Sequence, residues 1–200
     1  MNPTILIFLK APQLGRVKTR LAAEIGDAAA LDAYRRLVAR QMAALPTGWS
    51  VEVQFTPAAA EAEMRRWLGE APGRQFVAQR EGDLGAKLAF AVEGAFIRGA
   101  ARVLLIGGDC AELGGREFTA AARGLESHEV VLGPSKDGGY YLLGLRREHP
   151  EVFEGIAWST GAVAEQTRQR LRTRAIAWQE LNELRDVDTL ADWHLVENRV

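Results

Sequence analysis

Apolar and polar residues follow one another along the chain in the rhythm of strands and helices. Residues 4–9 and 103–106 are continuous apolar runs, a pattern typical of strands that are covered on both faces. Residues 31–45 carry apolar side chains at helical spacing behind Asp27, a plausible N-cap, which predicts an amphipathic helix. Alternation over residues 51–55 predicts a further strand.

The remaining segments continue this alternation. Further helices are expected over residues 58–69, 84–96, 115–125, 161–172 and 189–197. Further strands are expected near residues 76–77, 129–132, 140–145 and 174–178. The order predicts one α/β domain over residues 1–200, a three-layer Rossmann-like fold whose mostly parallel sheet has helices on both faces. Ligands bind beyond the carboxyl ends of such strands, so the loops after them are where we look for chemistry.

Charge and cysteine content narrow the class of protein. Lys and Arg number 25 against 26 Asp and Glu, for a net charge of -1, and 48% of the residues are hydrophobic. The charge balance excludes a protein held on nucleic acid by bulk charge, and the hydrophobic content excludes a disordered chain. Cys110 is the single cysteine, which excludes an intrachain disulfide and a cysteine metal cluster.

The N-terminal segment bears on where in the cell the protein is expected. The first apolar run is too short to span a membrane and lacks the layout of a signal peptide. We therefore expect a soluble cytoplasmic protein that uses neither a membrane nor nucleic acid as its partner. The sequence leaves the oligomeric state open, a homo-oligomer included.

The loop after the first strand has the composition of an anion site. It carries Gly15 and four cations, which are Lys10, Arg16, Lys18 and Arg20, and no acid occurs before residue 22. Gly15 permits close approach of the backbone, and Lys18 and Arg20 supply charge and donors to a polyphosphate. The spacing of a Walker A loop is absent. The alternative is an ordinary basic loop at a helix start, which the helix dipole disfavours.

Two carboxylates are candidates for a divalent metal. Asp109 follows the second apolar run and two glycines, and Asp188 lies with Asp186 near the C-terminus. Mg²⁺ typically takes one or two carboxylates together with waters and substrate oxygens. Each residue has a simpler alternative, because Asp109 could be an N-cap or turn residue before the next helix and Asp188 could cap the last helix. A metal role requires the two to meet in space.

Gln79, Gly82 and Asp83 lie between an expected strand and an expected helix. The Gln79 amide and the surrounding backbone could recognise the edge of a nucleobase. The signal is weak on its own, because Asp83 is also a good helix N-cap.

A second glycine-rich segment precedes the expected strand at residues 140–145. Asp137, Gly138, Gly139 and Tyr140 stand there in sequence, and the two glycines permit a ligand to approach the backbone closely. A tight hairpin turn would have the same composition, so both interpretations stay open.

Together these segments resemble the nucleotide-diphospho-sugar transferase superfamily, which has the glycosyltransferase-A fold, and within it a bacterial family of small glycosyltransferase-A-like proteins. The motifs that carry the resemblance are FLKAP at 8–12, GRVKTRL at 15–21, GDLG at 82–85, IGGDC at 106–110, DGGYYLLGL at 137–145, IAWST at 156–160 and DVDT at 186–189. The match runs from about residue 5 to about residue 192. The first loop is also similar to that of 2-phospholactate guanylyltransferase.

The resemblance implies a metal-dependent transferase. Its donor would be a nucleotide-sugar or a nucleoside triphosphate, laid across the first loop and the loop at 79–85, and it would pass a glycosyl or nucleotidyl group to a small acceptor. Mg²⁺ or Mn²⁺ would sit on Asp109 with Asp188 as the second carboxylate, while Lys18 and Arg20 neutralise the leaving charge. The turn at 137–141 would face the acceptor or the sugar.

One position departs from the family pattern. The family usually has Pro two residues after the metal Asp, where this chain has Ala111. The departure loosens the expected loop geometry. A nucleotide-binding regulatory module without turnover is therefore the alternative function.

Overall fold

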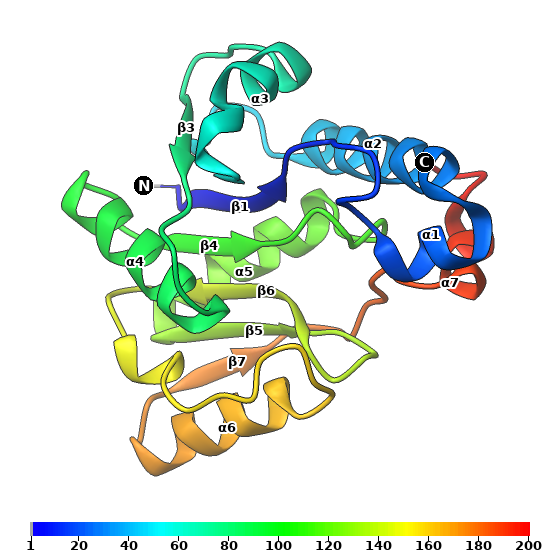
Figure 1. The fold of residues 1–200 in the computed structure, drawn as a ribbon. Helices are drawn as coiled ribbons and strands as arrows, with labels where there is room; N and C mark the ends of the chain where they lie inside the picture. The colour runs from blue at the N-terminus through cyan, green and yellow to red at the C-terminus, as the bar shows by residue number, and fades with distance from the viewer. Residues whose placement is uncertain (1) are drawn as a thin grey trace.

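The computed structural model describes residues 2–200. A seven-stranded sheet, in the order β3-β2-β1-β4-β6-β5-β7, forms the middle of the molecule (Figure 1). The strands are β1 (Thr4–Lys10), β2 (Val51–Thr56), β3 (Arg74–Ala78), β4 (Val103–Ile106), β5 (Val130–Pro134), β6 (Tyr140–Leu145) and β7 (Trp178–Glu180). All neighbours pair in parallel except at β6, which is antiparallel to both β4 and β5.

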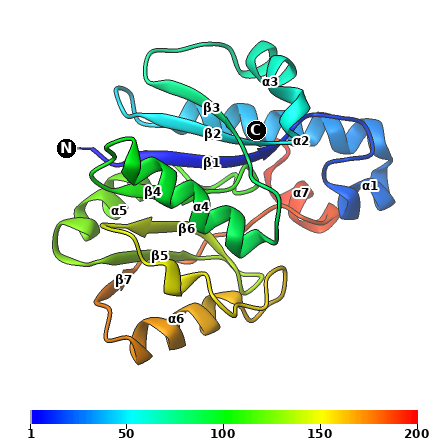
Figure 2. The same ribbon diagram turned by 60° about the vertical axis from the view of Figure 1, so that its left-hand side comes forward.

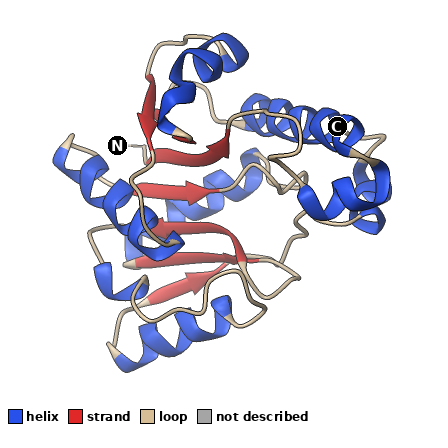
Figure 3. Ribbon diagram, in the orientation of Figure 1, coloured by secondary structure: helices blue, strands red, loops and turns tan. Residues whose placement is uncertain are grey.

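Helices cover both faces of the sheet, as the secondary-structure colouring of Figure 3 shows. The helices are α1 (Thr19–Ile25), α2 (Asp27–Ala44), α3 (Glu61–Leu68), α4 (Leu84–Ile97), α5 (Gly115–Ser127), α6 (Val163–Thr173) and α7 (Leu190–Val196). The structure also contains two short 3-10 helices, which are η1 (Ala58–Ala60) and η2 (Pro150–Val152). The expected three-layer α/β fold is therefore confirmed.

The two faces of the sheet bury separate cores. On one face, Ile5 and Ile7 of β1 pack with residues of α2, α3 and α5. On the other, Leu6 packs with residues of α4 and α6. Ile5, Leu6 and Ile7 are all 0% exposed. This two-sided burial explains why β1 is an uninterrupted apolar run rather than an alternating one.

A third, smaller core joins the two ends of the chain. Leu21 of α1, Leu37 of α2 and Trp193 of α7 are buried together with Val187, and α1 lies beside α7 in both Figure 1 and Figure 2. This packing brings residues 186–188 to the first loop. Among residues 2–200, no helix has the length and apolar character needed to cross a membrane.

Three local expectations differ from the structure. Helix α1 was not expected, because its seven residues are too few to show a period. Gly26, not Asp27, occupies the N-cap of α2. The strand expected at 174–178 begins only at Trp178, since Ala175 has a φ of 53°, which an extended strand does not allow.

Candidate active site at the carboxyl end of the sheet

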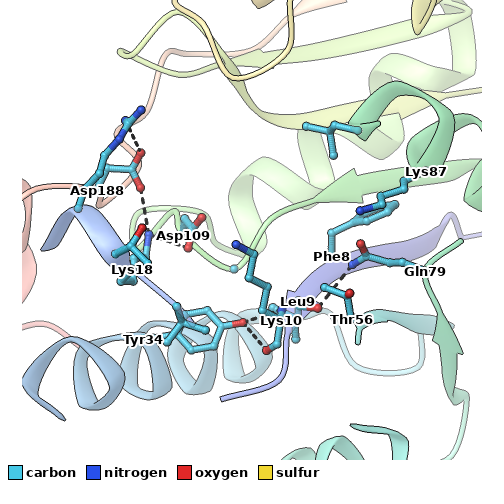
Figure 4. A pocket seen from close by; sticks show the side chains of 15 residues that line it. Phe8, Leu9, Lys10, Lys18, Tyr34, Thr56, Gln79, Lys87, Asp109 and Asp188 are labelled. Atoms are coloured by element: carbon cyan, nitrogen blue, oxygen red, sulfur yellow. Dashed lines mark hydrogen bonds and ion pairs between the residues drawn. The ribbon is translucent and has the colours of Figure 1, made fainter. Parts of the chain in front are cut away.

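A cavity of about 410 Å³ lies beyond the carboxyl end of β1 (Figure 4). Its ionic lining consists of four cations and two carboxylates, namely Lys10, Lys18, Arg20 and Lys87 with Asp109 and Asp188. Gln79, Thr56 and Phe8 also line it. The cavity therefore joins the first loop, the end of β3 and the loop after β4, which are strand ends at which the parallel-sheet rule predicts a site.

Lys18 lies between the two carboxylates. Its Nζ is 2.7 Å from Asp109 Oδ1 and 3.3 Å from Asp188 Oδ1, and it also donates to the Val187 carbonyl. The Lys18 side chain is only 4% exposed, whereas those of Asp109 and Asp188 are 45% and 41% exposed. Burial alone lowers the pKa of Lys18, but the charges of Asp109 and Asp188 raise it above its ordinary value overall.

A backbone hydrogen bond between residues 78 apart in sequence holds the two acidic loops together. The Val187 N–H donates to the Asp109 carbonyl over 3.0 Å, and Val187 is fully buried. Asp188 does not cap α7, because Thr189 is the N-cap and its hydroxyl accepts from the Asp192 N–H. The convergence that a shared metal requires is therefore present, and the capping alternative for Asp188 is wrong.

Arg20 lies at the outer edge of this group. Its guanidinium is 74% exposed and its Nη1 is 3.6 Å from Asp188 Oδ2. Lys10 also lines the cavity, and both its backbone N–H and its carbonyl are hydrogen-bonded to the Tyr34 hydroxyl. Gly15 has a φ of 70° in the exposed part of the loop and does not line the cavity.

Gln79 lies at the opposite end of the cavity from Lys18 in Figure 4, near Phe8, Thr56 and Lys87. Its Nε2 donates to the Gln54 carbonyl over 2.8 Å and to the Leu9 carbonyl over 3.5 Å. Both partners are acceptors, so the amide nitrogen must face them. The Gln79 side-chain oxygen is left to accept from a ligand.

The neighbouring Gly82 and Asp83 do not line the cavity. The Asp83 carboxylate is the N-cap of α4 and accepts from the Ala86 N–H over 2.8 Å. Gly82 has a φ of 132°, which favours glycine in the turn before that helix. The structure thus gives these two residues a role in starting α4.

The segment at 137–140 forms the connection between β5 and β6, away from the cavity lining. Asp137 Oδ1 accepts from the Ser135 hydroxyl and from the Gly139 N–H. Gly138 has a φ of 87°, and a Cβ there would lie 2.1 Å from the Gly161 carbonyl oxygen. Tyr140 packs edge-on against Trp158, with 6.3 Å between ring centroids. These are the contacts of a tight hairpin turn packed on the start of α6.

Asp186 is a further acidic residue near the candidate site, and the sequence alone favours Asp188 over it. Burial, followed by the nearby charges of Asp109 and Asp137, raises the pKa of Asp186 to about 7. Its carboxyl group also forms a hydrogen bond with the Ser135 side chain. The two-residue spacing in DVDT was the available signal, since a buried residue between two acids directs both to one side.

Among residues 2–200, no group of three or more His, Cys, Asp or Glu side chains has the arrangement of a metal site. Asp109 and Asp188 nevertheless fit a divalent cation in their chemistry. Their oxygens already gather around one positive charge, and carboxylate oxygens are the ligands that Mg²⁺ and Mn²⁺ prefer. Two carboxylates leave the other positions to water and phosphate oxygens.

Comparisons with known proteins give the chain its relatives. A candidate nucleotide-diphospho-sugar transferase from Desulfovibrio desulfuricans G20 is 33% identical, with a TM-score of 0.91 over 100% of this chain and 87% of that one. A CMP:2-keto-3-deoxy-manno-octonic acid synthetase complexed with CTP is 15% identical, with a TM-score of 0.60 over 99% and 98% of the two chains. Rv0371c from Mycobacterium tuberculosis H37Rv, in complex with manganese, is 20% identical, with a TM-score of 0.55 over 100% of both chains.

The last two likenesses establish the fold alone. None of the curated proteins matches the chain. A family model described as "Uncharacterized protein conserved in bacteria" (DUF2064) matches residues 38–160, which is more than half of the chain. The chain therefore belongs to this bacterial family and has the α/β fold of the nucleotide-diphospho-sugar transferases.

Proposed function

We propose that the protein is a metal-dependent transferase that acts on an activated nucleotide. The donor is a nucleotide-sugar or a nucleoside triphosphate, and a glycosyl or nucleotidyl group passes to a small acceptor. The observation that carries this proposal is the cavity at the end of β1, whose lining combines four cations with a pair of converging carboxylates. A cation-rich wall suits the phosphates of a nucleotide, and the carboxylates suit the metal that accompanies them.

The nucleotide would lie along the cavity with its two ends recognised differently. Lys10, Lys18 and Arg20 form the end that suits the phosphates. Gln79 offers an oriented amide oxygen at the other end, where a nucleobase presents its N–H groups. The CTP complex of the synthetase, which has the same fold, supports a nucleotide as the kind of ligand that this fold holds.

Asp109 and Asp188 would hold Mg²⁺ or Mn²⁺, an assignment in keeping with the manganese complex of Rv0371c. The bound metal would stabilise negative charge on the phosphate oxygens. Lys18 and Arg20 contribute to the same end, since their charges offset the charge that develops on the departing diphosphate or pyrophosphate. The acceptor would approach from the side of Asp186, which is close to both Asp109 and the Asp137 turn.

A panel of nucleoside triphosphates and nucleotide-sugars, each with and without Mg²⁺, tests this proposal by melting temperature. At least one nucleotide is expected to stabilise the protein in a Mg²⁺-dependent manner. Asp109→Ala is expected to abolish the Mg²⁺ dependence, whereas Asp32→Ala, an exposed carboxylate on α2 outside the cavity lining, is the matched control and retains it.

The outcomes separate the alternatives. A flat response across all nucleotides contradicts the proposal. Release of pyrophosphate in the presence of an acceptor identifies nucleotidyl transfer, and release of a nucleoside diphosphate identifies glycosyl transfer. Nucleotide binding with no turnover of any donor supports a regulatory module instead.

A further inference from the structure

The position between Asp109 and Asp188 has the surroundings of a bound cation. Three oxygens from two loops converge on Lys18 Nζ, namely Asp109 Oδ1, Asp188 Oδ1 and the Val187 carbonyl oxygen. The Lys18 side chain is 4% exposed, so water is largely excluded from the ammonium. A lysine ammonium has three donors, and each of the three oxygens takes one.

This arrangement sets Lys18 against a metal. A divalent cation bound through Asp109 Oδ1 and Asp188 Oδ1 would stand next to the buried Lys18 ammonium, and the two positive charges would repel each other at that short separation. Among the described residues, no third metal-ligating side chain joins Asp109 and Asp188. The two carboxylates therefore have no other group of ligands with which to hold a metal. Either the metal stays out or the ammonium leaves.

We propose that Lys18 is a resident counter-ion of the metal site, which holds Asp109 and Asp188 together without metal and leaves its place when a divalent cation binds. The displaced ammonium would turn into the cavity toward Lys10 and Arg20, where the proposed function puts the phosphates. Lys18 is thus a positioning residue for the carboxylates in one state and a phosphate partner in the other. The inference rests on the proposed role of Asp109 and Asp188 as metal ligands.

The backbone at Lys18 is suited to such an exchange. Lys18 has φ 47° and ψ 45°, the left-handed conformation, immediately before α1. This conformation is unfavourable for a residue with a side chain, so the three contacts of Nζ help to keep it. Lys18 also lines the cavity, so its side chain has that space to turn into.

Titration of the protein with Mn²⁺ alone, without nucleotide, tests the exchange, with free Mn²⁺ followed by electron paramagnetic resonance. Lys18→Met removes the competing charge while keeping the length of the side chain. It is expected to bind Mn²⁺ about tenfold more tightly than the wild type, a usual size for the coupling between two ligands. A Lys18→Met variant that binds Mn²⁺ equally or more weakly overturns the proposal.

Arg20→Met is the matched control, because it removes one positive charge 3.6 Å from Asp188 without vacating the space between the carboxylates. It is expected to tighten Mn²⁺ binding by less than about threefold, since an exposed charge is well screened. Equal gains in the two variants overturn the proposal, because general electrostatics would then account for both.

Two further measurements guard the result. Without metal, Lys18→Met is expected to melt below the wild type, and Mn²⁺ is expected to raise its melting temperature by more. Lys18→Gln, which keeps hydrogen-bond donors, replaces it for the titration if Lys18→Met does not fold. Because no nucleotide is present, a flat nucleotide panel would contradict the proposed function and leave this exchange standing, whereas an unchanged Mn²⁺ affinity would contradict only the exchange.

Discussion

Two ion clusters in this molecule, each with one buried charged side chain, are built on opposite plans. On β2, Glu52 is paired with Arg98, whose Nε and Nη2 donate to its two oxygens over 2.9 and 2.6 Å. Gln54 Nε2 adds a third donor over 3.0 Å. One acid thus meets one base, with the carboxylate 6% exposed, outside the cavity. The two charges of this cluster cancel, and its carboxylate is shielded from solvent.

The cluster at the end of β1 is open to the cavity. Lys18 is shared between Asp109 and Asp188, whose side chains are nearly half exposed, and Arg20 reaches Asp188 only over 3.6 Å at the exposed edge. Asp186 stands close enough for the charge of Asp109 to raise its pKa. The comparison indicates that burial of charge is not itself a mark of function, whereas a buried charge shared between half-exposed carboxylates beside a cavity marks a candidate site.

The largest effect on stability is expected at the balanced cluster. Glu52→Gln leaves the Arg98 guanidinium without its charge partner and should lower the free energy of unfolding by about 2 kcal/mol, as for a hydrogen bond to a charged group. Mn²⁺ affinity should not change. Urea unfolding and the Mn²⁺ titration measure the two quantities.

The control for this variant is Glu61→Gln, which breaks the exposed Glu61–Arg65 pair on α3 and should have little effect on unfolding. If Glu52→Gln lowers the free energy of unfolding as little as Glu61→Gln does, or if it changes Mn²⁺ affinity, then the Glu52 cluster is not purely structural.

The cluster around Lys18 should respond in the opposite way, with a larger effect on Mn²⁺ affinity than on the free energy of unfolding. Asp188→Asn leaves Lys18 paired with Asp109 at 2.7 Å and removes a repulsion between two carboxylates. The free energy of unfolding should therefore change by about 1 kcal/mol or less. Mn²⁺ affinity should fall about tenfold or more, because a carboxylate ligand is lost. A stability loss as large as that of Glu52→Gln would make Asp188 a structural residue.

Much of this architecture was predictable from local patterns. The continuous apolar runs identified β1 and β4, and the parallel-sheet rule directed attention to the loops that follow them. Cation-rich composition singled out the first loop, and turn-forming residues marked the hairpin at 137–140. Each of these features depends on neighbours in sequence, which a single chain displays directly.

The meeting of Lys18 with Asp188 could not be predicted, because 170 residues separate them and spacing carries no information over that range. It depends on the small core of α1, α2 and α7 around Val187. Helix α1, the core's first element, was itself missed. The burial of Asp186 follows from the same packing, so local composition gave no reason to prefer it to Asp188.

The smallest effect is expected at Ala111, two residues after Asp109, the proposed metal ligand. Ala111 is 5% exposed, packs in the small core, and its carbonyl accepts from Arg40 Nε over 2.8 Å. No hydrogen bond is made by its N–H among residues 2–200, and its φ is not positive. Ala111→Pro should therefore raise the free energy of unfolding by about 0.5 kcal/mol through a stiffer unfolded chain. Mn²⁺ affinity should not change, because tertiary contacts already hold this loop; a clear gain in affinity would show instead that Ala111 leaves Asp109 loosely placed.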